Sequence, residues 1–223
     1  MKYWSFGTVG TVAAAPVVPV REAATTLGAM SPAVSPYAIR IVGDPVLRQK
    51  TPEMTDIDGK MADLVHGMFE AMYAAPGIGL AAPQVGVKER FFVYDLGEDR
   101  GGQHVLINPV ITGSDGEWTY EEGCLSVPGQ YFEITRPKLI EVSGRDLDGN
   151  EVSFEADELL ARLIQHELDH LDGVLLLDHL DADQAKAAKK HVRELQMRKA
   201  DEADELEALA GDVPRKRLGL RLR

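Results

Sequence analysis

The chain has little that would suit an extracellular, membrane-spanning or nucleic-acid-coating protein. Its 223 residues include one cysteine, Cys124, so no intrachain disulfide can form, which fits a reducing compartment such as the cytoplasm. No apolar stretch is long enough to span a bilayer, so no membrane partner is expected. Acidic residues outnumber basic ones by 36 to 24, and the net charge of -12 argues against DNA as a partner and against a bulk RNA-binding surface.

The strongest positive signal is a His-Glu-x-x-His motif inside an apolar periodic stretch. Leucine and isoleucine recur at helical spacing from Leu159 to Leu171, which predicts an amphipathic helix. His166 and His170 then lie one turn apart on the same helix face, so both imidazoles can reach one metal ion. Glu167 lies beside them as a candidate general base. Two unrelated histidines are the weaker alternative, because this pattern arises by chance on the order of one time in a hundred.

The spacing leaves the third protein ligand open. Catalytic zinc or iron sites usually take three protein ligands and keep one position for water. Upstream, the candidate is Cys124, whose thiolate suits zinc and ferrous iron, although a lone cysteine is more often a buried inert thiol. Downstream, the candidates are Asp178, His179, Asp181 and Asp183. Two further acids lie near the motif, Asp169 and Asp172. We expect them to be solvated charges on the helix surface rather than groups that orient the histidines.

Composition and periodicity divide the chain into three parts. Residues 1–38 are rich in small and apolar residues with little charge, and we interpret them as a disordered extension, with Met30 as an alternative start. Residues 39–180 are the expected metal-dependent catalytic domain. Residues 181–223 are expected to form a charged, alanine-rich helix to about 210 and then a basic tail.

Within the expected catalytic domain, hydrophobic patterns predict both helices and strands. Helices are expected at about 60–75 and 157–173, and strands at 91–94, 105–107, 139–143 and 152–154. Turns are expected at 113–116 and 146–150, and irregular backbone over 77–84.

Three segments together resemble the peptide deformylase family: Gly77 to Gln84 (GIGLAAPQ), Glu122 to Ser126 (EGCLS) and Gln165 to His170 (QHELDH). They occur in the family's order, and the resemblance covers about residues 39–180. It implies that Cys124, His166 and His170 bind the metal. It also implies an α+β fold in which antiparallel sheets pack around a central helix carrying the His-Glu-x-x-His motif, with an additional C-terminal helix.

The resemblance further implies a reaction, namely removal of the formyl group from N-formyl-methionine at the start of nascent polypeptides. Metal-activated water would attack the formyl carbon, and Glu167 would take the water's proton and pass it to the departing amine. The Gln84 side-chain amide and the Leu125 backbone N–H would stabilise the oxyanion. Fe²⁺ is the expected ion, with Zn²⁺, Ni²⁺ and Co²⁺ as alternatives, because a site with two histidines and one cysteine accepts all four.

In similar proteins two of these segments flank a substrate that binds extended, as an added strand. The expected substrate-binding residues are therefore Gly77, Ile78, Gly79, Glu122 and Gly123. The methionine side chain would enter an apolar pocket, for which Ile78 and Leu163 are candidates. The chain departs from some bacterial members, which have an arginine soon after the cysteine motif, because its first arginine there is Arg136.

The C-terminal tail carries five basic residues and no acid: Arg215, Lys216, Arg217, Arg221 and Arg223. On an otherwise acidic chain this asymmetry suggests an RNA-binding appendage, with ribosomal RNA as the expected partner and a solvated tail as the equal alternative.

Two other functions compete with deformylation. One is a metallopeptidase with a downstream acidic ligand, and the other is a protein that uses the metal only structurally.

Overall fold

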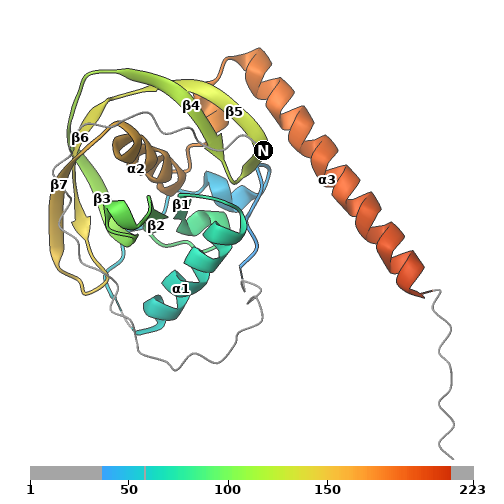
Figure 1. Cartoon of the computed structure of the whole chain (residues 1–223), viewed down its shortest axis with the longest axis horizontal. Coiled ribbons are helices and arrows are strands. Elements are labelled where there is room, and N and C mark those ends of the chain that lie inside the picture. Colours follow the sequence, from blue (N-terminus) through green and yellow to red (C-terminus); the bar gives the residue numbers. More distant parts are fainter. Residues whose placement is uncertain (1–36, 58, 212–223) are drawn as a thin grey trace, which may run out of the picture. The chain divides into compact units, whose positions relative to one another are not determined.

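The computed structural model describes residues 37–57 and 59–211 (Figure 1). The expected extension at residues 1–38 falls almost wholly outside these residues, and the basic tail at 215–223 falls wholly outside them. The structure divides after Leu180 into two units. The helices in the described residues are too short or too polar to cross a membrane.

The first unit combines two antiparallel sheets with two α-helices in its described residues. The larger sheet has the strand order β1-β2-β3-β6-β7, with bounds Gly79–Ala81, Phe91–Asp95, Gln103–Asp115, Leu139–Arg145 and Glu151–Asp157. The smaller sheet pairs β4 (Trp118–Cys124) with β5 (Val127–Arg136). The α-helices are α1 (Gly59–Ala74) and α2 (Glu158–Leu171). Short 3-10 helices cover Pro45–Arg48 (η1), Ala82–Val85 (η2), Glu98–Arg100 (η3) and Leu176–His179 (η4).

The two helices pack on opposite faces of the larger sheet, and strand β2 shows why. Successive side chains of a strand point to opposite faces. Phe91 and Val93 join a core with the apolar face of α1, which includes Met68 and Met72. Phe92 and Tyr94 join a second core with α2. β2 is therefore apolar at every position from Phe91 to Tyr94 because both of its faces are covered.

Helix α2 lies at the centre of the first unit, enclosed by curved strands in Figure 1. It contacts β1, β2, β6 and β7. Ile164 and Leu171 are fully buried there. Burying such a side chain contributes about 1.5–3 kcal/mol. The packing therefore fixes the helix that carries the His-Glu-x-x-His motif.

The α+β fold with a central motif helix and a C-terminal helix, α3 (Ala182–Gly211), is confirmed. Two local predictions were wrong. The segment 77–84 is not wholly irregular, because residues 79–81 form β1 through backbone pairing with β2. No turn occurs at 113–115, because β3 continues through Gly113 and Ser114, which pair with β6. The chain turns only at Gly116, whose φ of +65° suits glycine.

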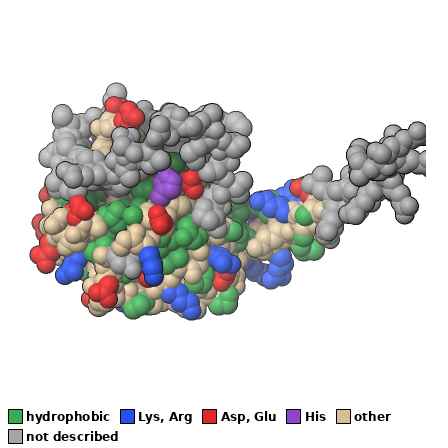
Figure 2. Space-filling view, turned by 90° about the horizontal axis from the view of Figure 1, so that it is seen from below, with side chains coloured by type: hydrophobic (Ala, Val, Ile, Leu, Met, Phe, Trp, Pro, Cys, Tyr) green, Lys and Arg blue, Asp and Glu red, His purple; other side chains and the backbone are tan. Residues whose placement is uncertain are grey.

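On the face of the molecule shown in Figure 2, described acidic and basic side chains are interspersed, with apolar side chains between them.

Candidate metal centre

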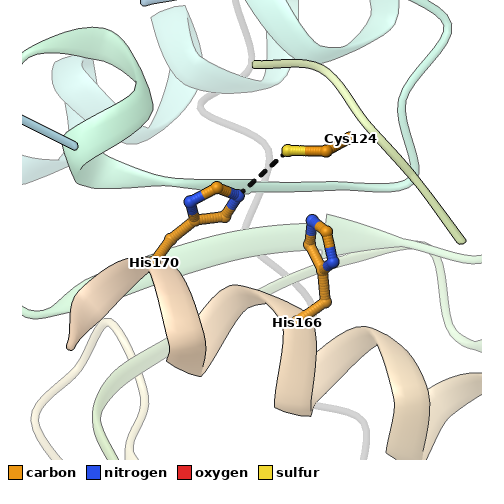
Figure 3. A group of neighbouring side chains, drawn as sticks. All are labelled: Cys124, His166 and His170. Atoms are coloured by element: carbon orange, nitrogen blue, oxygen red, sulfur yellow. Dashed lines mark hydrogen bonds between the residues drawn. The ribbon is translucent and has the colours of Figure 1, made fainter. Parts of the chain in front are cut away.

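Two secondary-structure elements bring three potential metal ligands together (Figure 3). His166 and His170 project from successive turns of α2, and Cys124 faces them from the end of β4. The ligand atoms of these three side chains all lie within 4.8 Å of one another. The Sγ atom of Cys124 is 3.2 Å from Nε2 of His170. Cys124 and His170 are buried, whereas 12% of the His166 side chain is exposed.

Three of the four downstream third-ligand candidates are engaged elsewhere. Asp178 binds Arg48 and accepts a hydrogen bond from the Leu175 backbone N–H. His179 binds Asp169 at 2.8 Å, and Asp181 accepts from the backbone at the start of α3. Among the described residues, the group able to hold a metal comprises Cys124, His166 and His170. The geometry therefore favours the upstream candidate that the spacing alone could not select.

The electrostatics of the group favour a bound cation. Burial raises the pKa of the Cys124 thiol, but the imidazoles of His170 and His166 lower it by more, so the thiolate is favoured. Burial lowers the pKa of His166, but Cys124 and Glu122 raise it well above its usual value. Positive charge is thus stabilised where the three side chains meet. A thiolate and two imidazoles are a donor set that suits divalent transition metals, so the residues present fit such an ion.

Glu122 lies behind His166 with its side chain directed into the protein. Its carboxylate is 3.1 Å from His166 Nδ1 and accepts hydrogen bonds from Arg136 at 2.6 and 3.0 Å. Burial would raise the pKa of Glu122, but the bonds from His166 and Arg136 outweigh it and lower the pKa to about 2. An ionised carboxylate only accepts hydrogen bonds. Nδ1 of His166 must therefore donate, which leaves Nε2 of a neutral ring free for a metal.

This placement changes the interpretation of two residues. The Glu122 side chain is committed to His166, so an added strand could meet only the backbone of Glu122 and Gly123. Arg136 is also buried and binds Asp169 at 2.9 Å as well as Glu122. It is therefore occupied inside the protein and is not available to hold a substrate.

Glu167 packs tightly against β1. A Cβ atom at Gly79 would lie 2.5 Å from Glu167 Oε1, so a side chain at this position would displace the carboxylate. The other oxygen, Oε2, is buried without a hydrogen-bond partner. Burial raises the pKa of Glu167 to about 7, although His166 and His170 oppose the shift. A bound dication would lower that pKa. The unpartnered oxygen could accept a proton close to the side chains of Cys124, His166 and His170.

Gln84 has its side-chain amide held in one orientation. Its Oε1 accepts a hydrogen bond of 2.8 Å from the Ala81 N–H, which turns Nε2 toward the metal-ligand group. Nε2 then lies 3.2 Å from Ser126 Oγ and 3.8 Å from Cys124 Sγ. Leu125 follows the cysteine, and its side chain packs on Gly77, where an added Cβ would lie at 2.7 Å. Residues of all three motifs therefore lie around one point.

Two strand ends flank this point. In the described residues β1 pairs with β2 alone and β4 pairs with β5 alone, so each has a second edge that no described strand covers. Ile78, just before β1, and Leu163, on α2, belong to the same apolar core. The two candidates for the methionine pocket therefore lie on one side of the sheet.

Comparisons with known proteins agree with this site. A model of the polypeptide deformylase family matches residues 36–186. A peptide deformylase of Agathobacter rectalis is 50% identical over 143 residues, which are 64% of this chain and 89% of that protein. The crystal structure of a peptide deformylase from Legionella pneumophila is similar at a TM-score of 0.71 and 36% identity, covering 74% of this chain and 97% of that one. One from Synechococcus elongatus, in complex with actinonin, gives a TM-score of 0.65 and 42% identity, covering 69% and 85%.

Proposed function

Because the chain belongs to the peptide deformylase family, we propose that Cys124, His166 and His170 hold its divalent metal ion and that Glu167 is its general base. The enzyme is a metal-dependent amide hydrolase that removes the formyl group from the N-terminal N-formyl-methionine of nascent polypeptides. The observation that supports the residue roles is the meeting of the three ligands with a buried, unpartnered carboxylate oxygen.

The side chains divide the hydrolysis between them. When bound, a divalent ion supplies the Lewis acidity that makes water nucleophilic near neutral pH. Glu167 removes a proton from the attacking water while the water oxygen forms a bond to the formyl carbon. Gln84 Nε2 and the Leu125 N–H donate to the carbonyl oxygen as negative charge develops on it. The C–N bond then breaks, Glu167 returns the proton to the amine, and formate leaves.

We further propose that the peptide binds as an extended strand between β1 and β4. Gly77, Ile78 and Gly79 would border it on one side, and the backbone of Glu122 and Gly123 on the other. Unpaired strand edges bind extended peptides through main-chain hydrogen bonds. The methionine side chain would then enter the core between Ile78 and Leu163.

Cys124→Ala tests the ligand set. The variant should lose the metal that copurifies with the wild-type protein, and with it formate release from a formyl-methionyl peptide. Elemental analysis after purification without oxygen measures the first result, and an assay for formate the second. Retention of the metal in Cys124→Ala would favour a third ligand downstream, as in the metallopeptidase alternative.

The proposed native ion is Fe²⁺, which oxygen oxidises, so the activity of the enzyme should depend on contact with air. Activity of the iron-loaded enzyme should decay in air, because ferrous iron and the Cys124 thiolate both oxidise. The nickel-loaded enzyme should decay more slowly. Activity is followed over hours in air and under nitrogen for both forms. Equal lifetimes in air would contradict iron as the source of the decay.

The proposed location is the cytoplasm, where formylated nascent chains are made, and the proposed partner is the ribosome, bound through the tail at residues 215–223. Deleting this tail should leave turnover of a short formyl-peptide unchanged, because the catalytic residues lie within 77–170. Ribosome affinity should fall. Binding by the intact protein should weaken with salt, with a log–log slope from the tail of at most about -4 to -5 for five phosphate contacts.

A sedimentation assay with purified ribosomes at several salt concentrations measures the effect of the tail. Unchanged binding after deletion, or binding insensitive to salt, would leave the tail as a solvated end. The charged helix α3 would then be the next candidate for docking.

A further inference from the structure

A second arginine, Arg162, holds the carboxylate that supports His166. Arg162 lies on α2 one turn before His166, and the two residues are on the same helix face. Its Nη1 atom donates to Glu122 Oε1, while His166 Nδ1 contacts Glu122 Oε2. One carboxylate from β4 therefore spans two successive turns of the motif helix.

The position of Arg162 is fixed from several sides. Its guanidinium donates to the Ile134 carbonyl at 2.9 Å and to the Trp118 carbonyl. It also lies 4.9 Å from the centre of the Trp118 ring and 6.0 Å from that of Tyr120. Only 3% of the residue is exposed. A guanidinium held by hydrogen bonds and ring faces keeps its direction, so it restricts the position of the Glu122 carboxylate.

The same contacts set how β4 lies against α2. Glu122 and Cys124 are two positions apart on β4, and both face α2, as alternation along a strand requires. Glu122 meets Arg162 and His166, and Cys124 meets His170 one turn further along. A shift of Glu122 along α2 would carry Cys124 away from His170. The arginine and the three metal ligands are thus parts of one rigid arrangement.

We propose that Arg162 is a positioning residue for the metal centre, acting through Glu122 to hold the Nδ1–H of His166 and to present its Nε2 to the ion. This inference rests on the proposed ligand set. Carboxylates that orient a metal-binding histidine typically contribute about 10–100-fold to metal affinity. Arg162 would act on the ion only through Glu122, so its effect should disappear when Glu122 can no longer transmit it.

Metal affinity of the full chain tests the proposal, with Co²⁺ or Zn²⁺ titrated against a chelator of known affinity. Arg162→Met should weaken binding about 10–100-fold. The matched control is Arg48→Met, because Arg48 pairs with Asp178 at the surface. The metal affinity of this variant should equal that of the wild type. The double variant Glu122→Gln/Arg162→Met should bind no more weakly than Glu122→Gln alone. The proposal would be overturned if the double variant lost metal affinity by the product of the two single losses. It would also be overturned if Arg162→Met bound the metal as tightly as the wild type.

A nuclear magnetic resonance measurement reports on His166 directly. In the zinc-loaded wild type the Nδ1–H proton of His166 should exchange slowly with water, and in Arg162→Met it should exchange rapidly. Slow exchange in both proteins contradicts the proposal. If Arg162→Met does not fold, Arg162→Lys replaces it in the same cycle, because it keeps the charge but cannot reach both Glu122 and the Trp118 carbonyl. A wild-type protein that binds no divalent ion would instead overturn the proposed function.

Discussion

Glu167→Gln is expected to keep the metal and lose about 10²–10⁴-fold in deformylation rate. The amide has nearly the shape of the carboxylate, so it should occupy the same space beside Gly79. It cannot accept the proton of the attacking water. In the proposed mechanism the proton acceptor is Oε2 of Glu167, which is buried and lacks a partner in the structure. The measurement is kcat for a formyl-methionyl peptide at equal metal content.

The matched control for this variant lies on the same helix. Glu158 begins α2 and pairs with Lys138 at the surface. Glu158→Gln makes the same chemical change away from the ligands and should leave kcat unchanged. Near-normal turnover by a metal-loaded Glu167→Gln enzyme would remove Glu167 from the mechanism.

Gln84→Leu is expected to lower kcat about 10²–10³-fold with little change in KM. An oxyanion donor acts mainly in the transition state, when the carbonyl oxygen becomes negative, so substrate binding should be nearly unaffected. Steady-state kinetics over a range of formyl-peptide concentrations separates the two constants. A pure KM effect would mean that Gln84 only binds substrate.

Leucine at position 84 also leaves the Ala81 N–H without its acceptor, which costs about 1–3 kcal/mol of stability when the group is buried. Gln84→Glu separates the two effects, because it keeps an acceptor for Ala81 but has no N–H to donate. Both variants should lose kcat if donation is what matters. Recovery of activity in Gln84→Glu would assign the loss to the Ala81 contact instead.

The sequence predicts the motif helix and the apolar strands well because their signals are local. Helical spacing from Leu159 to Leu171 follows from the burial of α2, and β2 has a continuous apolar run because both faces are covered. β1 has no such signal. Its three residues are glycine, leucine and alanine, and they become a strand only because β2 supplies backbone partners.

Local sequence patterns also could not predict the charged residues that hold the proposed metal ligands in place. Arginines are rarely buried without a partner. No residue next to Arg162 or Arg136 in the sequence indicates which partner each of them has. Their common acceptor, Glu122, lies 40 and 14 positions away. The motif resemblance assigned Glu122 to the substrate, whereas its side chain contacts His166. Only the folded arrangement of β4, β5 and α2 brings these charges together.

If Cys124 and His170 hold the ion, as proposed, their separation in the sequence affects the lifetime of the folded enzyme. Cys124 and His170 are 46 positions apart, so an ion held between them is a cross-link between β4 and α2. Such an ion binds the folded chain but has no assembled site in the unfolded one. At a free concentration 100 times its dissociation constant it would add about 2.7 kcal/mol to folding stability. Loss of the metal would then shorten the lifetime of the folded protein as well as abolish its activity. The metal-free chain would unfold more often and expose Cys124 to oxidation.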